Sequence, residues 1–296
     1  MELAVQQIIN ALSLGSIYAL VALGVAIVFS ILRLANFAHG ELVTVSGYTL
    51  YLTLGVMPWF FAFPLAVAAA VVAALLLERL AYRKLRGAQP LTLLMTSFAV
   101  SVGLQSLFLL VFGPRPKSIE LPIFVDAMVT VGGFRIQLLD VVTLFATILI
   151  VLVLTVFLRR TILGLAMRAA ADDFPVTQLM GVRANAVIVG AFAVSGLLAG
   201  IAGLFLFAIV PNVVPTSGFD PMLKGFIACV IGGLGSLPAA VAGSFLLAFV
   251  EVGCGALLSS TLNPYLDAIV FAVAIAILRW RPSGVLGVRL AEDIRV

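Results

Sequence analysis

The residues best suited to chemistry in this chain lie in one short polar segment, Asn36-Phe37-Ala38-His39-Gly40-Glu41. The segment holds the only histidine among the 296 residues, with a carboxylate two positions later. Asn36 could cap a backbone group, and Glu41 could pair with His39 or with a helix N-terminus. Gly40 would allow the backbone to unwind between them.

Known catalytic arrangements are missing from the rest of the sequence. A catalytic zinc usually needs three protein ligands, but the chain has one histidine and two scattered cysteines, Cys229 and Cys254, which we interpret as packing residues. No Gly-x-Ser triplet and no G-x-x-x-x-G-K-[ST] phosphate loop occurs. We therefore expect a chain that is not an enzyme and that holds no metal and no cofactor, so any ATP would be used by partner subunits.

The polar segment lies between two uncharged runs, 30 residues from Leu3 to Leu32 and 36 residues from Leu42 to Leu77. A helix needs about 20 apolar residues to cross the hydrocarbon, so each run is long enough to span a membrane. Hydrophobic residues make up 63% of the chain and charged residues 10%, and no hydrophilic stretch is long enough to fold separately. The composition predicts an all-α, polytopic transmembrane helical bundle in which residues 1–296 form a single membrane domain.

Basic residues gather in three clusters at the ends of apolar runs, and the positive-inside rule places all three in the cytoplasm. This bias also accounts for the net charge of +4, so we expect no binding to nucleic acid. The clusters are Arg79, Arg83, Lys84 and Arg86; Arg159, Arg160, Arg168 and Arg183; and Arg279, Arg281 and Arg289. The number of crossings between clusters must be even, which predicts eight to nine crossings in total. Nine satisfies every cluster and puts the N-terminus outside.

Two features of the sequence predict how these crossings are broken and packed. Pro58 and Pro64 split the second long run into two crossings, and a glycine-rich break follows later in the chain. Small residues four positions apart predict close helix packing. These pairs are Gly196 and Gly200, Ala199 and Gly203, and Ala239 and Gly243.

The later break, Gly232-Gly233-Leu234-Gly235-Ser236, is either a re-entrant turn or a link between two short crossings. Discontinuous helices in transporters tend to mark the pathway, because unwound backbone presents free polar groups. One hypothesis is that Asn36, His39, Gly40 and Glu41 line or gate a route, faced by Gly232, Gly233, Gly235 and Ser236. The alternative is that the first segment is a cytoplasmic turn, with Arg33 at the lipid boundary.

Four charged residues in the C-terminal third need separate interpretation. Glu251 and Asp267 lie in apolar sequence and could carry protons, but we expect both to be hydrated near the outer face. Asp220 and Lys224 flank Pro221 and are interpreted as outer-loop or interface residues.

Residues 159–184 form the longest predicted cytoplasmic loop. Leu165 to Asp173 is rich in good helix formers, and Pro175 and Gly181 interrupt the sequence after it. The pattern predicts a short helix, a turn and a second apolar turn. These would form either a rigid handle or an interfacial helix that lies on the lipid.

Together, the 36–41 segment, the loop from Arg168-Ala169-Ala170-Ala171-Asp172-Asp173 to Gly181-Val182, and the glycine break resemble the branched-chain amino acid permeases of bacterial ABC importers, the LivH type. The resemblance covers about residues 6 to 285. It implies a multi-pass protein of the bacterial inner membrane that imports leucine, isoleucine or valine.

The resemblance also implies partners, namely a second, homologous permease, two cytoplasmic ATP-binding subunits, a periplasmic binding protein and the surrounding membrane lipid. The loop is similar to the coupling loop that sits in a groove of the ATPase. This implies a coupling role for Gly164, Arg168, Ala170, Asp172, Asp173 and Gly181, with Arg168 and the two aspartates making polar contacts and Gly181 forming the turn.

Other functions stay open on the sequence alone. The substrate could be urea, a short amide or another amino acid. A stand-alone ion-coupled secondary transporter could instead use Glu41, Glu251 or Asp267. An intramembrane enzyme would lack both nucleophile and metal ligands.

Overall fold

The computed structural model describes residues 2–33, 35–85, 87–122, 128–131, 134–258, 263–281 and 284–285. Within these ranges the apolar helices correspond one for one to the nine predicted crossings. They are α1 (Glu2–Leu32), α2 (His39–Leu54), α3 (Trp59–Leu77), α4 (Pro90–Phe112), α5 (Leu138–Arg160), α8 (Ala184–Ile209), α9 (Phe219–Gly232), α10 (Leu237–Leu257) and α11 (Leu266–Trp280). Two further helices, α6 (Ile162–Asp172) and α7 (Phe174–Leu179), lie between α5 and α8.

Six helices in the described part of the chain are long and apolar enough to cross a membrane, namely α1, α3 with its extension to Leu85, α4, α5, α8 and α10. The other three, α2, α9 and α11, have 16, 14 and 15 residues, which corresponds to about 21 to 24 Å against about 30 Å of hydrocarbon. The polytopic helical fold is confirmed. Whether each short helix crosses completely stays a prediction.

The predicted breaks at Pro58 and at the later glycines are confirmed, whereas Pro64 lies inside α3 and does not break it. Pro58 is the residue before α3, and its fixed φ suits the start of a helix. Gly232 ends α9, and the chain turns through Gly233 and Gly235, which have φ of 124° and 94°. Such left-handed conformations favour glycine, so this turn depends on its sequence.

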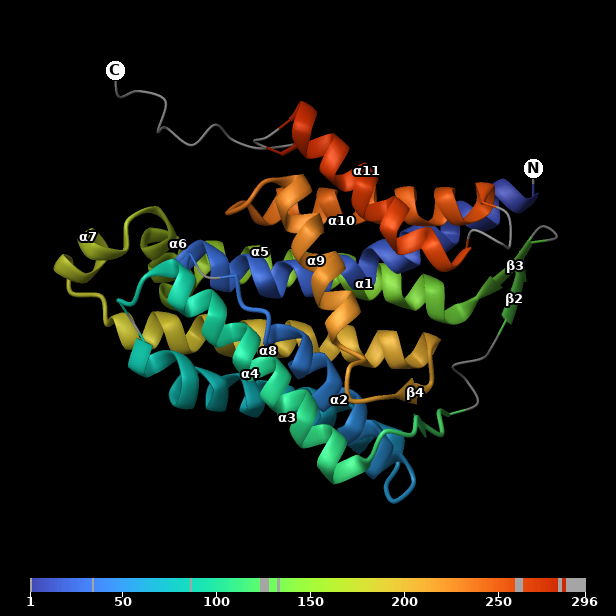
Figure 1. Cartoon of the computed structure of the whole chain (residues 1–296), viewed down its shortest axis with the longest axis horizontal. Helices are drawn as coiled ribbons and strands as arrows, with labels where there is room; N and C mark the ends of the chain where they lie inside the picture. Colours follow the sequence, from blue (N-terminus) through green and yellow to red (C-terminus); the bar gives the residue numbers. More distant parts are fainter. Residues whose placement is uncertain are drawn as a thin grey trace.

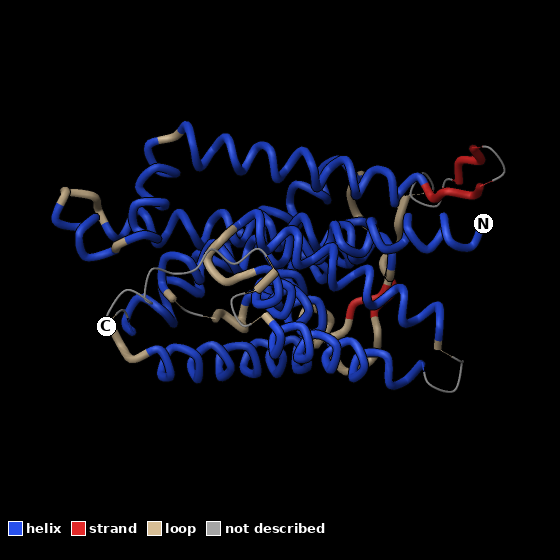
Figure 2. The backbone as a smooth tube through the Cα atoms, turned by 90° about the horizontal axis from the view of Figure 1, so that it is seen from above, coloured by secondary structure: helices blue, strands red, loops and turns tan. Residues whose placement is uncertain are grey.

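α1 lies at the centre of the bundle and packs against α5, α8, α9 and α10 (Figure 1). α9 runs obliquely to the longer helices in the same view. Seen from above, the long helices extend side by side along the longest axis of the molecule (Figure 2). α3, α4 and α5 are mostly exposed, as expected of helices that face lipid.

The predicted close packing of small residues is confirmed where α3 meets α8. Ala70 and Ala74 of α3 are fully buried. A Cβ atom added to Gly196 would lie 2.6 Å from Ala74 Cβ, and one added to Gly200 would lie 2.9 Å from Val67 Cα. Only glycine lets the two backbones approach so closely.

The described basic clusters share one end of the bundle, which we call the basic end. It contains the last turn of α1, the π-helix Glu78–Tyr82 and 3₁₀ helix Arg83–Leu85 that extend α3, and both α6 and α7. Its described basic residues include Arg79, Arg83, Lys84, Arg159, Arg160, Arg168 and Arg183, together with Arg279 and Arg281 of the third cluster beside the turn before α10. Arg86 and Arg289 lie outside the described residues. This agrees with the common sidedness predicted for the clusters.

Short strands occupy the opposite end (Figure 1). β1 (Lys117–Ser118) pairs antiparallel with β4 (Asn212–Val213), with Lys117 opposite Val213. β2 (Met128–Val131) and β3 (Phe134–Gln137) form a hairpin before α5, with Met128 opposite Gln137. The 3₁₀ helix Asn263–Tyr265 precedes α11.

Candidate functional site

The 36–41 segment folds back into the protein from the end of α1. Arg33 adopts a φ of 52°, rare for a residue with a side chain, and its N–H donates to Phe29 O at 2.8 Å. The chain then turns inward and α2 begins at His39. The side chains of His39 and Glu41 are completely buried and Asn36 is 1% exposed. The segment is therefore an interior element, not an exposed cytoplasmic turn.

Asn36 holds the turn together. Its Oδ1 accepts one hydrogen bond from the Ala38 N–H at 3.1 Å and another from the Tyr82 hydroxyl at 2.6 Å. Tyr82 ends the π-helix that continues α3, and it is buried together with Glu78 in the same π-helix. π-Helical turns often occur at functional sites. Tyr82 was not among the residues predicted from the sequence.

His39 connects the start of α2 to α8 and α1. Its Nδ1 lies 2.9 Å from the Ser195 hydroxyl of α8. Its ring packs directly against Gly24 of α1, where any Cβ atom would collide with it. Its Nε2 is buried with no hydrogen-bond partner among the described residues.

Glu41 reaches α4. Its Oε1 accepts hydrogen bonds from the Ser101 hydroxyl and from Gln105 Nε2, each at 2.8 Å. Its Oε2 is buried, and no described residue donates to it. Ser97, Ser101 and Gln105 recur every four residues along α4, and this polar line on an apolar helix is the signal that could have identified Glu41's partners in the sequence.

Gly40 lets the start of α9 approach the start of α2. Gly40 packs directly against the Gly218 backbone, and the Gly218 N–H donates to Thr44 Oγ1 at 3.0 Å. The predicted role of Gly40 in unwinding is not what the structure shows. Gly40 lies within α2, and its lack of a side chain permits close helix contact.

The glycine break lies away from this segment. Gly218 touches Gly40, whereas Gly232 comes 14 residues later along α9, which corresponds to about 21 Å. Gly232 packs against Ala239 of α10, and the Val285 N–H donates to Ile231 O at 2.7 Å beside it. Gly233 and Ser236 belong to the same turn. The structure thus places the two predicted halves of the route at opposite ends of α9, and their lining of a route stays a prediction.

A buried charge cluster joins α1, α9, α10 and α11. Lys224 Nζ lies 2.8 Å from Glu251 Oε1, 2.9 Å from Asp267 Oδ1 and 3.3 Å from Asp220 Oδ2. The Tyr18 hydroxyl donates to Glu251 Oε2 at 2.9 Å. Lys224 is 5% and Glu251 9% exposed. The prediction that Glu251 is hydrated is wrong, because a buried cation replaces water as its partner. Lys224 lies within α9 and pairs with α10 and α11, so of its two interpretations the outer loop is wrong and the interface fits. The side chains of Asp220 and Asp267 are 58% and 56% exposed, as expected of hydrated carboxylates.

Residues 159–184, which we call the handle, lie at the basic end and contain α6 and α7. Thr161 Oγ1 accepts from the Gly164 N–H at 3.0 Å and begins α6, and Asp173 Oδ1 accepts from the Val176 N–H at 3.0 Å and begins α7. Gly181, with a φ of 86°, closes the segment. The predicted helix, turn and second helical turn are confirmed.

The handle is fixed to the membrane bundle at α6. Gly164 and Ala170 are buried, and Gly164 packs directly against the backbone of Leu158. Arg168 Nε donates to Leu158 O at 2.9 Å. α6 contacts α1, α5 and α8, so it is packed on protein. The outward side presents Asp172 and Asp173 together with exposed apolar residues, namely Leu165, Val176, Leu179 and Met180.

Comparison with known proteins identifies relatives over nearly the whole chain. Residues 7–278 match the family described as branched-chain amino acid transport system / permease component. The chain is 33% identical over 295 residues to the high-affinity branched-chain amino acid transport system permease protein BraD of Pseudomonas aeruginosa, covering 95% of each. It is 33% identical over 302 residues to the corresponding LivH of Salmonella typhimurium, again covering 95% of each.

A more distant relative is the probable branched-chain amino acid transport permease protein LivH of Methanocaldococcus jannaschii, 27% identical over 294 residues. No solved structure matches the chain. Apart from the first residues of α1, the family match covers all six helices that are long and apolar enough to span a membrane in the described part of the chain. The chain is therefore a multi-pass membrane protein that belongs to the branched-chain amino acid transport system permease family.

Proposed function

We propose that this chain is a permease subunit of a bacterial inner-membrane ABC importer that moves leucine, isoleucine and valine into the cytoplasm. The observation that supports this most is the handle, a pair of short helices that leaves apolar side chains exposed at the basic end. Leu179 is 87% and Met180 80% exposed there. Exposed apolar residues on a fixed support are typical of a surface that a partner protein covers.

In this proposal the handle docks on an ATP-binding subunit. Leu165, Val176, Leu179 and Met180 would fill an apolar groove, while Asp172 and Asp173 make polar contacts around it. Arg168, whose Nε donates to Leu158 O, would hold α6 on the bundle. Gly164 and Ala170 fix α6 to the bundle, and Gly181 sets the turn into α8. Because α6 is packed on α1, α5 and α8, a movement of the ATPase would be passed to the membrane helices.

The 36–41 segment would control the route through the bundle. Asn36, His39 and Glu41 each keep one polar atom, Nδ2, Nε2 and Oε2 respectively, that is buried without a partner among the described residues. Buried polar atoms are nearly always hydrogen-bonded, so three exceptions in one segment suggest that another conformation satisfies them. We propose that α2 exchanges these partners when the transporter opens.

The remaining subunits would be a second, homologous permease, two ATP-binding subunits in total and a periplasmic binding protein. Reconstitution in proteoliposomes tests this assembly. The chain with all partners should accumulate leucine only when ATP is hydrolysed, and the chain alone should accumulate none. Uptake by the chain alone, driven by an ion gradient, would instead support the secondary transporter.

The substrate is tested separately on the proposed periplasmic binding protein. We expect it to retain leucine, isoleucine and valine in equilibrium dialysis. Retention of urea or a short amide, with no affinity for these amino acids, would contradict the proposed substrate and leave the ABC mechanism intact.

A further inference from the structure

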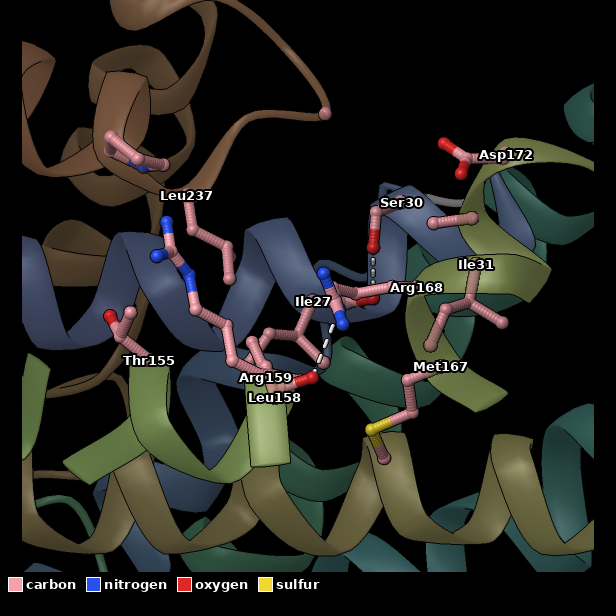
Figure 3. A pocket seen from close by; sticks show the side chains of 13 residues that line it. Ile27, Ser30, Ile31, Thr155, Leu158, Arg159, Met167, Arg168, Asp172 and Leu237 are labelled. Carbon is pink, nitrogen blue, oxygen red and sulfur yellow. Dashed lines mark hydrogen bonds between the residues drawn. The ribbon is translucent and has the colours of Figure 1, made fainter. Parts of the chain in front are cut away.

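A second feature of the basic end is a cavity of about 430 Å³ that lies between the membrane helices and the handle. Its walls come from the last turns of α1 and α5, from α6, and from the turn that leads into α10 (Figure 3). It is separate from the 36–41 segment and from the Lys224 cluster, none of whose residues line it.

Two arginines provide the polar side of this cavity. Arg159 ends α5 and Arg168 lies on α6, and both guanidinium groups reach the cavity (Figure 3). Arg168 uses its Nε to bind Leu158 O at 2.9 Å, which leaves its terminal nitrogens free to donate. Neither arginine forms an ion pair with a carboxylate in the described part of the chain.

One carboxylate, that of Asp172, also borders the cavity. Figure 3 shows it on the far rim, apart from both guanidinium groups. Two cations and one anion leave a net positive charge. The cavity therefore favours an anionic group over a zwitterionic one.

The rest of the lining is mainly apolar, apart from the hydroxyl side chains of Ser30 and Thr155. The apolar residues include Ile31 of α1, Leu158 of α5 and Leu237 of α10. Further along α5, Leu149, Leu152 and Val156 are 61%, 57% and 58% exposed, as expected of a face that contacts lipid. A ligand here would have an anionic head and an apolar tail that continues along α5.

We propose that this cavity binds the headgroup of an anionic phospholipid from the cytoplasmic leaflet. A guanidinium group binds phosphate oxygens through parallel hydrogen bonds, and basic pockets between transmembrane helices on the cytoplasmic side bind anionic headgroups. The bound lipid lies directly behind α6 and stiffens the handle against the bundle. The lipid site depends on the membrane placement of the chain and not on the proposed transport cycle.

The test compares two neighbouring arginines of α5. Arg159→Gln removes a cavity cation, whereas Arg160→Gln removes an exposed cation that does not line the cavity. The full chain, purified with the subunits that accompany it, is exchanged into nanodiscs containing phosphatidylglycerol or phosphatidylcholine. Bound lipid is then counted by native mass spectrometry. Loss of one charged hydrogen-bonding partner should weaken phosphatidylglycerol retention about tenfold in Arg159→Gln. Arg160→Gln should retain as much as the wild type.

A second variant keeps both arginines and fills the apolar wall. Leu237→Trp should displace the lipid because the larger side chain fills the cavity. Loss of lipid in this variant would show that the cavity itself, and not only its charge, is needed for binding. Equal loss in Arg159→Gln and Arg160→Gln would overturn the proposal. Retention of phosphatidylcholine equal to that of phosphatidylglycerol would also overturn it. So would displacement of the bound lipid by millimolar inorganic phosphate, or the absence of bound lipid in the assembled complex.

Discussion

Replacing Lys224 should strongly lower the free energy of unfolding. The variant Lys224→Met keeps a long apolar stem and removes the ammonium group. It leaves the Glu251 carboxylate 9% exposed with only the Tyr18 hydroxyl as a partner. Removing one partner of a buried ion pair costs about 3–5 kcal/mol. Asp220 and Asp267 contribute little to this figure, because their side chains are 58% and 56% exposed and water screens them.

Unfolding can be followed with a thiol-reactive fluorescent dye, because Cys229 in α9 is 1% exposed and its thiol donates to Ala22 O at 3.0 Å. Cys254 is partly exposed and is replaced by alanine to remove its background. Lys224→Met should label at a clearly lower temperature than the parent. Lys84→Met, which changes an exposed lysine, should label as the parent does.

The double variant Lys224→Met with Glu251→Gln shows why Lys224→Met loses stability. If the cost comes from an unpaired buried carboxylate, neutralising Glu251 should restore part of the lost stability. A double variant as unstable as the sum of its two single variants, or a Lys224→Met variant as stable as the parent, would refute this reasoning.

Four further predictions test the site and the handle. Tyr82→Phe removes the hydroxyl that binds Asn36 Oδ1 and should lower stability by about 1 kcal/mol in the same thermal assay, and an unchanged midpoint would contradict this. Gly40→Ala should prevent stable assembly, because the added methyl group would force α2 away from the Gly218 backbone. Gly103→Ala should be tolerated because Gly103 has open space around it, and size-exclusion profiles would show the difference. Glu41→Gln and, separately, His39→Ala should reduce leucine uptake and stimulated ATP hydrolysis in an intact complex, and normal values for both would exclude a role in the route. Leu179→Asp should abolish ATP-driven uptake, whereas Met128→Asp, an equivalent exposed change in β2, should leave it intact.

Local signals predicted much of the fold. Pro58 before α3, Gly232 at the end of α9, and the glycines of α8 each impose a backbone constraint that their own sequence position reveals. The handle was predicted for the same reason, since α6 and α7 are defined by nearby helix formers and caps.

The partners of the candidate site could not be predicted in this way. His39 meets Ser195 from 156 positions away, and Glu41 meets Ser101 from 60 positions away. The π-helix buries Tyr82 at a place where ordinary helical spacing gives no reason to expect it. Glu251 was expected to be hydrated near the outer face, and only the fold shows that Lys224, 27 positions away, is its buried partner.

In the proposed importer the handle meets an ATP-binding subunit in the cytoplasm. Site-directed cysteine crosslinking tests this contact in a chain in which Cys229 and Cys254 are replaced by alanine. Leu179→Cys should crosslink to the ATP-binding subunit and stay unlabelled by a membrane-impermeant thiol reagent applied outside. Met128→Cys, at the opposite end, should be labelled by the reagent applied outside and should form no crosslink to the ATP-binding subunit. Labelling of Leu179→Cys from outside, with no crosslink to the ATP-binding subunit, would contradict the account.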